Sequence, residues 1–295
     1  MISFRQHLLT IVAIFLALAV GVVLGGGPLA EVSARQSDEP TVETDEPAAA
    51  GGEDFESGFA RAVGPALVTG KLAERSVALL TLPGADEQVV TALSDQVTAA
   101  GGTLASRHDL AAAVVDPRQK SLVDTLGSQL MTQQAGGAIE GEPSTYERLG
   151  QLLGIAVATK VPEGQGATGK TRAVADALAG ADLVPVAAED ADRAPLVLVV
   201  MGEDAEDPSV DAILSGLVNG LAAQAVGVVV AGTTDDGQGQ LGRLRSDAAA
   251  STAGTVDGVE TPAGATAAVL LLARSLATPG GSFGASGADG PVPLG

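Results

Sequence analysis

The first strong feature of the chain is an uninterrupted apolar run near its N-terminus. Leu8–Leu24 reads LLTIVAIFLALAVGVVL, follows Arg5 and His7, and is followed by no charged residue until Glu31. At 1.5 Å of rise per residue, a helix of this length nearly spans a hydrocarbon core of about 30 Å. The pattern therefore predicts a single transmembrane helix, and residues 1–30 are interpreted as a cytoplasmic tip and membrane anchor.

A cleaved signal peptide is the alternative interpretation, with Val32-Ser33-Ala34 as a late cleavage site. The apolar run exceeds the usual signal-peptide core of about 7–15 residues, which favours an anchor. Arg5 lies close to the run and favours an N-terminus inside the cell, with everything after residue 30 outside. Ala17, Gly21 and Gly25 stand four apart, so two such helices could pack into a homo-oligomer, although chance spacing explains them equally well.

The pattern then changes twice to segments without periodic apolar positions. Residues 31–58 combine two prolines, paired glycines and many carboxylates, which predicts a disordered acidic linker. Residues 279–295, GGSFGASGADGPVPLG after Pro279, are predicted to form a flexible Gly/Pro tail.

Residues 59–278 alternate between strand and helix patterns. Residues 76–82 form a continuous apolar run that Pro83-Gly84 stops, which is typical of a strand covered on both faces. Asp86 then caps a helix that ends at Gly101. Further helices are predicted at 117–130, 144–156, 171–179, 209–223 and 263–277, and strands at 183–186, 196–201 and 226–231. Strands joined by helical crossovers predict an extracytoplasmic α/β domain, a Rossmann-like parallel sheet in three layers.

Composition narrows the partners and the chemistry. The formal net charge is −20, so nucleic acid and anionic lipid surfaces, which need a basic face, are not expected partners. The chain has no cysteine, which excludes disulfides, thiolate catalysis and Cys-based metal sites. The lipid bilayer, through Leu8–Leu24, and an envelope protein are the expected partners.

The residues also resemble a known family. MISFRQHLLTIVAIFLALAVGVVLG is similar to the start of the mycobacterial copper transport protein B (MctB) family of actinobacterial envelope proteins. Further matches are EDFESGFARAVGPALVTGKLAERSVALLTLPGA, QLLGIAVAT, VGVVVAG and the glycine-rich C-terminus. The resemblance spans nearly the whole chain. It implies copper export or tolerance at the cell membrane, and family members are also assigned to the outer membrane.

The chain's own side chains do not define a copper site. Copper(I) prefers Cys or Met ligands, and copper(II) prefers imidazole. The available donors, Met1, Met131, Met201, His7 and His108, are scattered, and no two can be paired by spacing. No metal site and no cofactor are predicted, and His108 is interpreted as an ordinary surface or loop histidine.

One motif suggests nucleotide binding. Gly164-Gln-Gly-Ala-Thr-Gly169-Lys170-Thr171 matches the phosphate-binding pattern GxxxxGK[ST] and precedes a predicted helix. In that interpretation backbone amides cradle phosphates, Lys170 reaches their oxygens and Thr171 holds Mg²⁺. The preceding apolar stretch ends early, at Ala158, and no apolar run ends directly in an aspartate. The alternative is a flexible loop that caps a helix.

Three other patterns are weaker. Gly280–Gly284 matches GxSxG, but no histidine follows Ser282. Gly237–Gly242 matches GxGxxG and is interpreted as a solvated loop. The acidic clusters Glu189/Asp190/Asp192 and Glu203/Asp204/Glu206/Asp207 lack EF-hand spacing and are interpreted as solvated turns.

No catalytic residue is predicted. The sequence favours a non-enzymatic, membrane-anchored cell-envelope protein, with copper export or tolerance implied by resemblance. A structural or regulatory partner in cell-wall remodelling or cell separation is the alternative. An enzyme that binds nucleotide through Gly164–Thr171 is a third, minor hypothesis.

Overall fold

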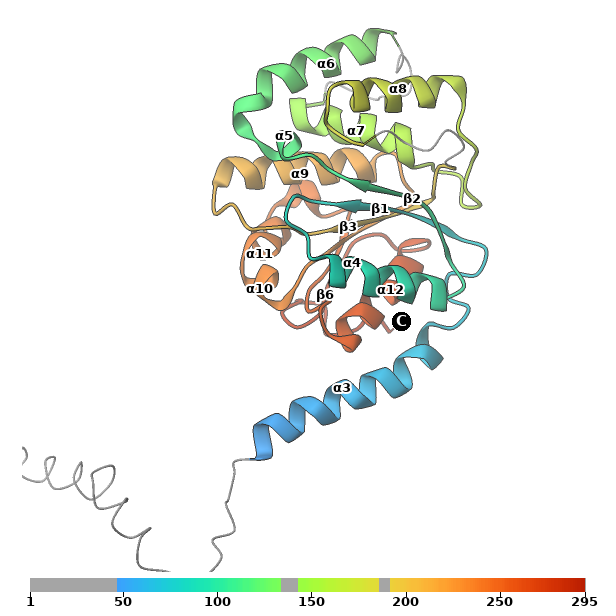
Figure 1. Ribbon diagram of the computed structural model, residues 1–295, viewed down its shortest axis with the longest axis vertical. Coiled ribbons are helices and arrows are strands. Elements are labelled where there is room, and N and C mark those ends of the chain that lie inside the picture. Colours follow the sequence, from blue (N-terminus) through green and yellow to red (C-terminus); the bar gives the residue numbers. More distant parts are fainter. Residues whose placement is uncertain (1–46, 134–142, 186–191, 295) are drawn as a thin grey trace, which may run out of the picture. The chain divides into compact units, whose positions relative to one another are not determined.

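A computed structural model describes residues 47–133, 143–185 and 192–294 of the chain (Figure 1). The chain divides into two units, Met1–Gly51 and Gly52–Gly295, and the second unit holds the sheet. The predicted membrane helix Leu8–Leu24 lies outside the described residues, as do 31–46 of the predicted linker. Within the described ranges, no helix has the length and apolar character needed to cross a bilayer.

The fold is α/β, with one six-stranded sheet in the order β2-β1-β3-β4-β5-β6 and every neighbouring pair parallel. This confirms the predicted α/β class and parallel sheet. The elements in chain order are α3 (Pro47–Val68), β1 (Ser76–Thr81), α4 (Glu87–Ala99), β2 (Thr103–Asp109), α5 (Ala112–Val115), η1 (Pro117–Gln119), α6 (Lys120–Gln133), α7 (Thr145–Val157), α8 (Gly169–Gly180), β3 (Leu196–Val200), α9 (Pro208–Ala222), β4 (Gly227–Ala231), α10 (Thr234–Gln238), α11 (Gln240–Arg245), η2 (Ala248–Ala250), β5 (Gly254–Val256), α12 (Pro262–Ser275) and β6 (Ser282–Phe283).

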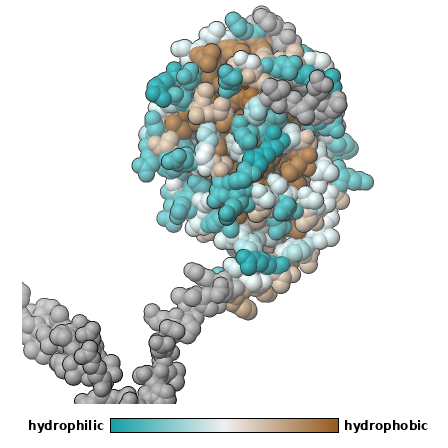
Figure 2. Space-filling model, viewed as in Figure 1, coloured by the Kyte–Doolittle hydropathy of each residue, from teal (hydrophilic) through white to brown (hydrophobic). Residues whose placement is uncertain are grey.

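Two hydrophobic cores lie on opposite faces of the sheet. Side chains alternate along each strand, so Leu80 in β1 packs into one core and its neighbour Leu79 into the other. Helices α6, α7, α8 and α9 cover the first face, and α4 and α12 cover the second (Figure 1). Outside these cores, hydrophilic and apolar side chains share the surface seen in Figure 2, with the apolar ones in separate patches.

The strands predicted at the centre of the sheet are confirmed. The strands closer to its edges were not predicted correctly. The strand predicted at 183–186 is wrong for its described residues, because 183 and 184 form a bend and 185 belongs to no regular element. The edge strand β2 was missed because only one of its seven residues is fully buried, which leaves little apolar alternation in the sequence. Strand β5, with three residues, is too short for periodicity to show.

The two segments predicted to be unstructured also differ. Helix α3 begins at Pro47, inside the predicted linker 31–58. In the predicted flexible tail, 279–295, residues Ser282–Phe283 form β6 and pair with β5. Glycine-rich composition alone does not show that Phe283 is buried against the second core, with 5% of its surface exposed.

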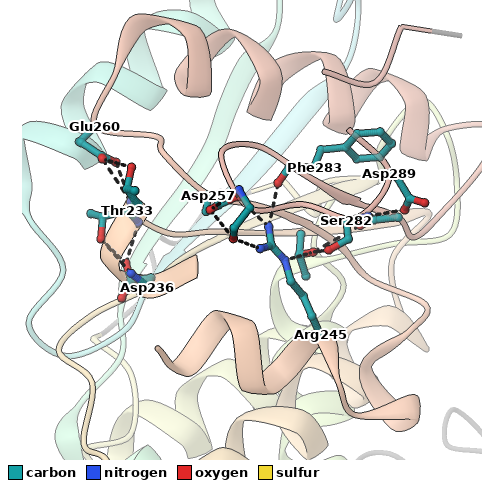
Figure 3. Close-up of polar contacts among 12 residues, drawn as sticks. Thr233, Asp236, Arg245, Asp257, Glu260, Ser282, Phe283 and Asp289 are labelled. Atoms are coloured by element: carbon teal, nitrogen blue, oxygen red, sulfur yellow. Dashed lines mark hydrogen bonds and ion pairs between the residues drawn. The ribbon is translucent and has the colours of Figure 1, made fainter. Parts of the chain in front are cut away.

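A buried ion pair holds this last strand in place (Figure 3). Asp257 follows β5 and is fully buried, and Arg245 of α11 donates to its carboxylate at 2.9 Å. The same guanidinium donates to the carbonyl oxygen of Phe283 at 2.7 Å. The backbone N–H and hydroxyl of Ser286 donate to Asp257 as well, at 2.9 and 2.7 Å. Residues from α11, β5, β6 and the C-terminal segment therefore meet at one charge pair.

Replacing Arg245 by leucine is expected to lower the free energy of unfolding by about 3–5 kcal/mol, because Asp257 is left buried and uncompensated. Arg243→Leu is the matched control on the same helix. Arg243 pairs with Asp204 and Asp211 but is 39% exposed, so its loss should cost about 1 kcal/mol or less.

Urea denaturation followed by circular dichroism measures both effects. The double variant Arg245→Leu/Asp257→Asn no longer carries the unpaired carboxylate charge. It should therefore recover a large part of the lost free energy of unfolding. Equal losses for Arg243→Leu and Arg245→Leu would contradict a special role for the buried pair.

Candidate functional site

The strand order creates one crevice at the carboxyl edge of the sheet. From β1 the chain proceeds to β2 on one side and then returns to β3 on the other side of β1. In open parallel sheets, ligands bind outside the carboxyl ends of the strands at such a reversal. A cavity of about 560 Å³ lies at this position, between the loops that follow β1, β2 and β3. Its size is in the range of ordinary small-molecule sites.

The two loops beside the reversal are packed tightly against each other. Gly84 adopts φ +84°, and a side chain there would press on Glu203. A Cβ at Gly202 would overlap the carbonyl oxygen of Pro83. The Glu203 N–H donates to that same carbonyl at 3.1 Å. Contacts within the protein itself therefore hold this rim of the cavity.

The cavity has an apolar floor and a charged mouth. Leu82, Val210 and Leu214 are buried beneath it. Asp116, Glu203 and Asp204 bring three carboxylates to its lining, against the single guanidinium of Arg118.

Two of these carboxylates are held by arginines. Arg118 donates to Asp116 at 3.0 Å, and this hydrogen bond lowers the pKa of Asp116. Arg243 donates to Asp204 at 2.6 Å and lowers its pKa in the same way. Both acids are therefore ionised at neutral pH. Across the parts of the chain that the structure describes, Glu203 makes no side-chain hydrogen bond or ion pair.

Sequence reasoning placed Glu203 and Asp204 in a solvated turn and did not connect them with Asp116. The connection was missed because β2, which brings Asp116 to this edge, was itself missed. One signal in the sequence could have brought these loops together. Residues 76–82 and 196–201 both have the pattern of buried parallel strands, so the loops that follow them must lie at the same edge of the sheet.

The phosphate-loop pattern lies at the opposite edge of the sheet. Gly164 adopts φ +82° and packs against Ser76, the first residue of β1, and against residues that precede β3. The backbone of Gln165 pairs with that of Arg193, also before β3. The loop follows helix α7 and a single bridge at Ala158, and no strand of the sheet leads into it. A phosphate loop normally follows the carboxyl end of a strand.

The residues proposed to bind phosphate and Mg²⁺ have local structural roles. Gly169 and Lys170 are the first residues of α8, and Thr168 caps that helix. The Thr171 hydroxyl accepts from the Thr168 N–H at 2.9 Å and donates to the Thr168 carbonyl at 3.1 Å. This capping box matches the alternative interpretation of the motif, a loop that caps a helix.

The GxGxxG and GxSxG motifs both include residues of regular secondary structure. Gly237–Gly242, interpreted as a solvated loop, instead spans the short helices α10 and α11, and Gly237 is buried. Ser282 lies in β6, where its N–H donates to Asp289 at 2.8 Å and its hydroxyl contacts that of Thr255.

His108 is buried, contrary to the prediction of a surface or loop residue. It lies in β2 with 5% of its surface exposed and lines a cavity of about 30 Å³ beside α7 and α8. The Ser106 hydroxyl on the same strand face has no hydrogen-bond partner among the described residues. Burial lowers the pKa of His108, and the charge of Asp109 opposes this shift.

The described residues do not assemble a metal centre. Among them, no group of three or more His, Cys, Asp and Glu residues is arranged to hold a metal ion. His108 lines its small cavity, whereas Met201 is 3% exposed within the core at the end of β3.

Comparisons with known proteins give a consistent result. The model of the family described as "Copper transport outer membrane protein, MctB" matches residues 1–293. Proteins named "Copper transporter MctB" from Mycobacterium bovis (strain ATCC BAA-935 / AF2122/97) and Mycobacterium tuberculosis (strain ATCC 25618 / H37Rv) are each 30% identical over 174 residues. The match covers 53% of this chain and 53% of each relative, so the chain spans about half the length of these relatives.

Acidification should destabilise the protein through His108. The unfolded imidazole has a pKa of about 6.5, and burial lowers that of the folded state. Below about pH 6.5 the unfolded chain therefore binds a proton that the folded chain does not, and stability falls as the pH decreases. Melting temperatures measured between about pH 7.5 and 5 should show this decline.

His108→Leu is expected to flatten that part of the curve, because the neutral side chain cannot titrate. Arg172 and Asp192 line the same cavity and stay unchanged in this variant. Parallel pH curves for the wild type and the variant would show that another group causes the decline.

Proposed function

This chain belongs to the MctB family, and we propose that it is a non-enzymatic, membrane-anchored cell-envelope protein that acts in copper export or tolerance. The observation that carries the proposal is the family match over residues 1–293, supported by relatives named as copper transporters. The apolar run Leu8–Leu24 supports an anchor, and Arg5 supports an N-terminus inside.

Copper is cargo in this proposal, and the described domain is not its storage site. Copper(I) needs two or more soft or imidazole ligands close together. His108 and Met201 are both buried, and the carboxylates of the crevice suit harder cations. The proposal therefore gives the domain a part in copper handling and assigns no copper ligand within it.

Deleting the protein should raise both copper sensitivity and cell-associated copper. The inhibitory copper concentration and the metal content of washed cells measure these effects. The intact chain should restore both values, and so should Lys170→Ala, because no step of this proposal uses nucleotide. Unchanged sensitivity and copper content after deletion would overturn the proposal.

A structural or regulatory role is the second candidate, and the exposed face of α3 favours it. Phe55 and Phe59 are 72% and 60% exposed and stack with ring centroids 6.3 Å apart. Leu67, two turns further along the helix, is 39% exposed. Exposed apolar rows of this kind mark protein interaction sites. We infer that this row contacts an envelope protein with an apolar surface, as expected of a partner in wall remodelling or cell separation.

A photo-crosslinking residue at Ala62, on the exposed side of α3, should capture one envelope protein in intact cells. Phe55→Ser with Phe59→Ser should abolish capture, because the aromatic contact is lost. Leu122→Ser is the matched control, since Leu122 is also exposed but lies on α6. Normal cell separation after deletion, with no specific capture, would count against this candidate.

A further inference from the structure

The crevice at the carboxyl edge has the wrong charge for the ligands that such crevices usually hold. Nucleotides bind there because helix N-termini offer free N–H groups and partial positive charge to phosphate. In this chain the helices that follow β1 and β3 begin with their own acids. Asp86 caps α4 and accepts from the Gln88 N–H at 2.7 Å. Asp207 caps α9 and accepts from the Ser209 N–H at 2.8 Å.

The next helix along the edge also has acids in its first turn, although a threonine, Thr233, is its cap. Helix α10, after β4, carries Asp235 and Asp236 in its first turn, and Asp236 accepts from the Thr233 N–H at 2.7 Å. Helix α9 also has Pro208 at its first position, which removes one N–H donor. A phosphate at the start of α4, α9 or α10 would therefore meet carboxylates in place of free donors.

The cavity lining favours the opposite charge. Its three carboxylates face one guanidinium, and Arg118 is already paired with Asp116. Asp204 is paired with Arg243, which leaves the negative charge of Glu203 unbalanced by any ion pair of the described residues. The buried floor of Leu82, Val210 and Leu214 provides apolar surface for a short hydrocarbon chain.

We propose that the cavity between the loops after β1, β2 and β3 is a binding site for a small organic cation, an aliphatic amine whose ammonium group faces Glu203 and whose carbon chain covers the apolar floor. The preformed rim, in which Gly84 and Gly202 let the two loops meet, reduces the ordering cost of binding. The site is independent of copper handling, and it gives this domain a small-molecule ligand.

Hexylamine is the test ligand, with hexanol and hexanoate as probes of equal length and different charge. Isothermal titration calorimetry of the full chain in zwitterionic nanodiscs, corrected for empty nanodiscs, measures binding. Hexylamine should bind at least about tenfold more tightly than hexanol, and hexanoate should not bind. Added salt should weaken the binding of the amine.

Glu203→Gln should weaken hexylamine binding about tenfold, because the unpaired charge is removed without a change of shape. Ala205→Trp places a large side chain at the mouth from an exposed position and should abolish binding. Glu163→Gln is the matched control, an exposed glutamate in the loop at the other edge, and should bind like the wild type. Circular dichroism establishes that each variant is folded.

Equal binding of hexylamine and hexanoate, or of wild type and Glu203→Gln, would overturn the proposal. So would the absence of heat from hexylamine at millimolar concentration. The comparison of the three hexyl compounds uses the wild-type chain alone, so the proposal can fail even if a variant does not fold. Copper sensitivity is measured separately, so failure of either proposal leaves the other standing.

Discussion

The common direction of the six strands is the constraint on which the rest of the structure depends. Parallel neighbours cannot be joined by a tight turn, so each strand is followed by a connection that crosses a face of the sheet. Both faces are then covered, and the central strands must be apolar on both sides, as SVALLT, LVLVV and GVVVA are. The same direction brings every loop that follows a strand to one edge. The crevice between β1 and β3 exists because of this arrangement.

The last two strands of the sheet, β5 and β6, show how a short strand pair is held where little apolar surface is available. Strands β5 and β6 contribute only five residues to the ladder, too few to secure the C-terminal segment by apolar burial alone. Arg245 and Asp257 supply the missing attachment, since their charges are buried and each is saturated with hydrogen bonds. Such a pair adds little net stability compared with apolar packing, but it tolerates only one arrangement of its partners. It therefore favours a unique position for β6.

The charges at the carboxyl edge differ from those expected of a nucleotide site in an open parallel sheet. Three helices at the carboxyl edge, α4, α9 and α10, carry an aspartate at their N-terminus, namely Asp86, Asp207 and Asp236. The phosphate-loop motif Gly164–Thr171 lies at the amino edge and ends in a capping box. From the topology alone, an anionic ligand would be expected at the crevice. The carboxylates that line it favour a cationic ligand instead. Family membership and the proposed role in copper handling are compatible with this, because transported copper need not bind at the crevice of the domain.

The sequence by itself determined the α/β class, the parallel sheet, the three central strands and helices such as α7, α9 and α12. These features depend on local periodicity: a strand buried on both faces and a helix with one apolar side each leave a pattern in consecutive residues. It also contained the family resemblance, from the N-terminal motif to the glycine-rich end. The tertiary structure decided the rest. Strands β2 and β6 are stabilised by neighbours distant in the sequence, so their residues show no pattern of their own. Likewise, Asp116 and Glu203, which are 87 positions apart, line one cavity only because β2 and β3 flank β1. His108 is buried for the same reason, since α7 and α8 cover its face of an edge strand.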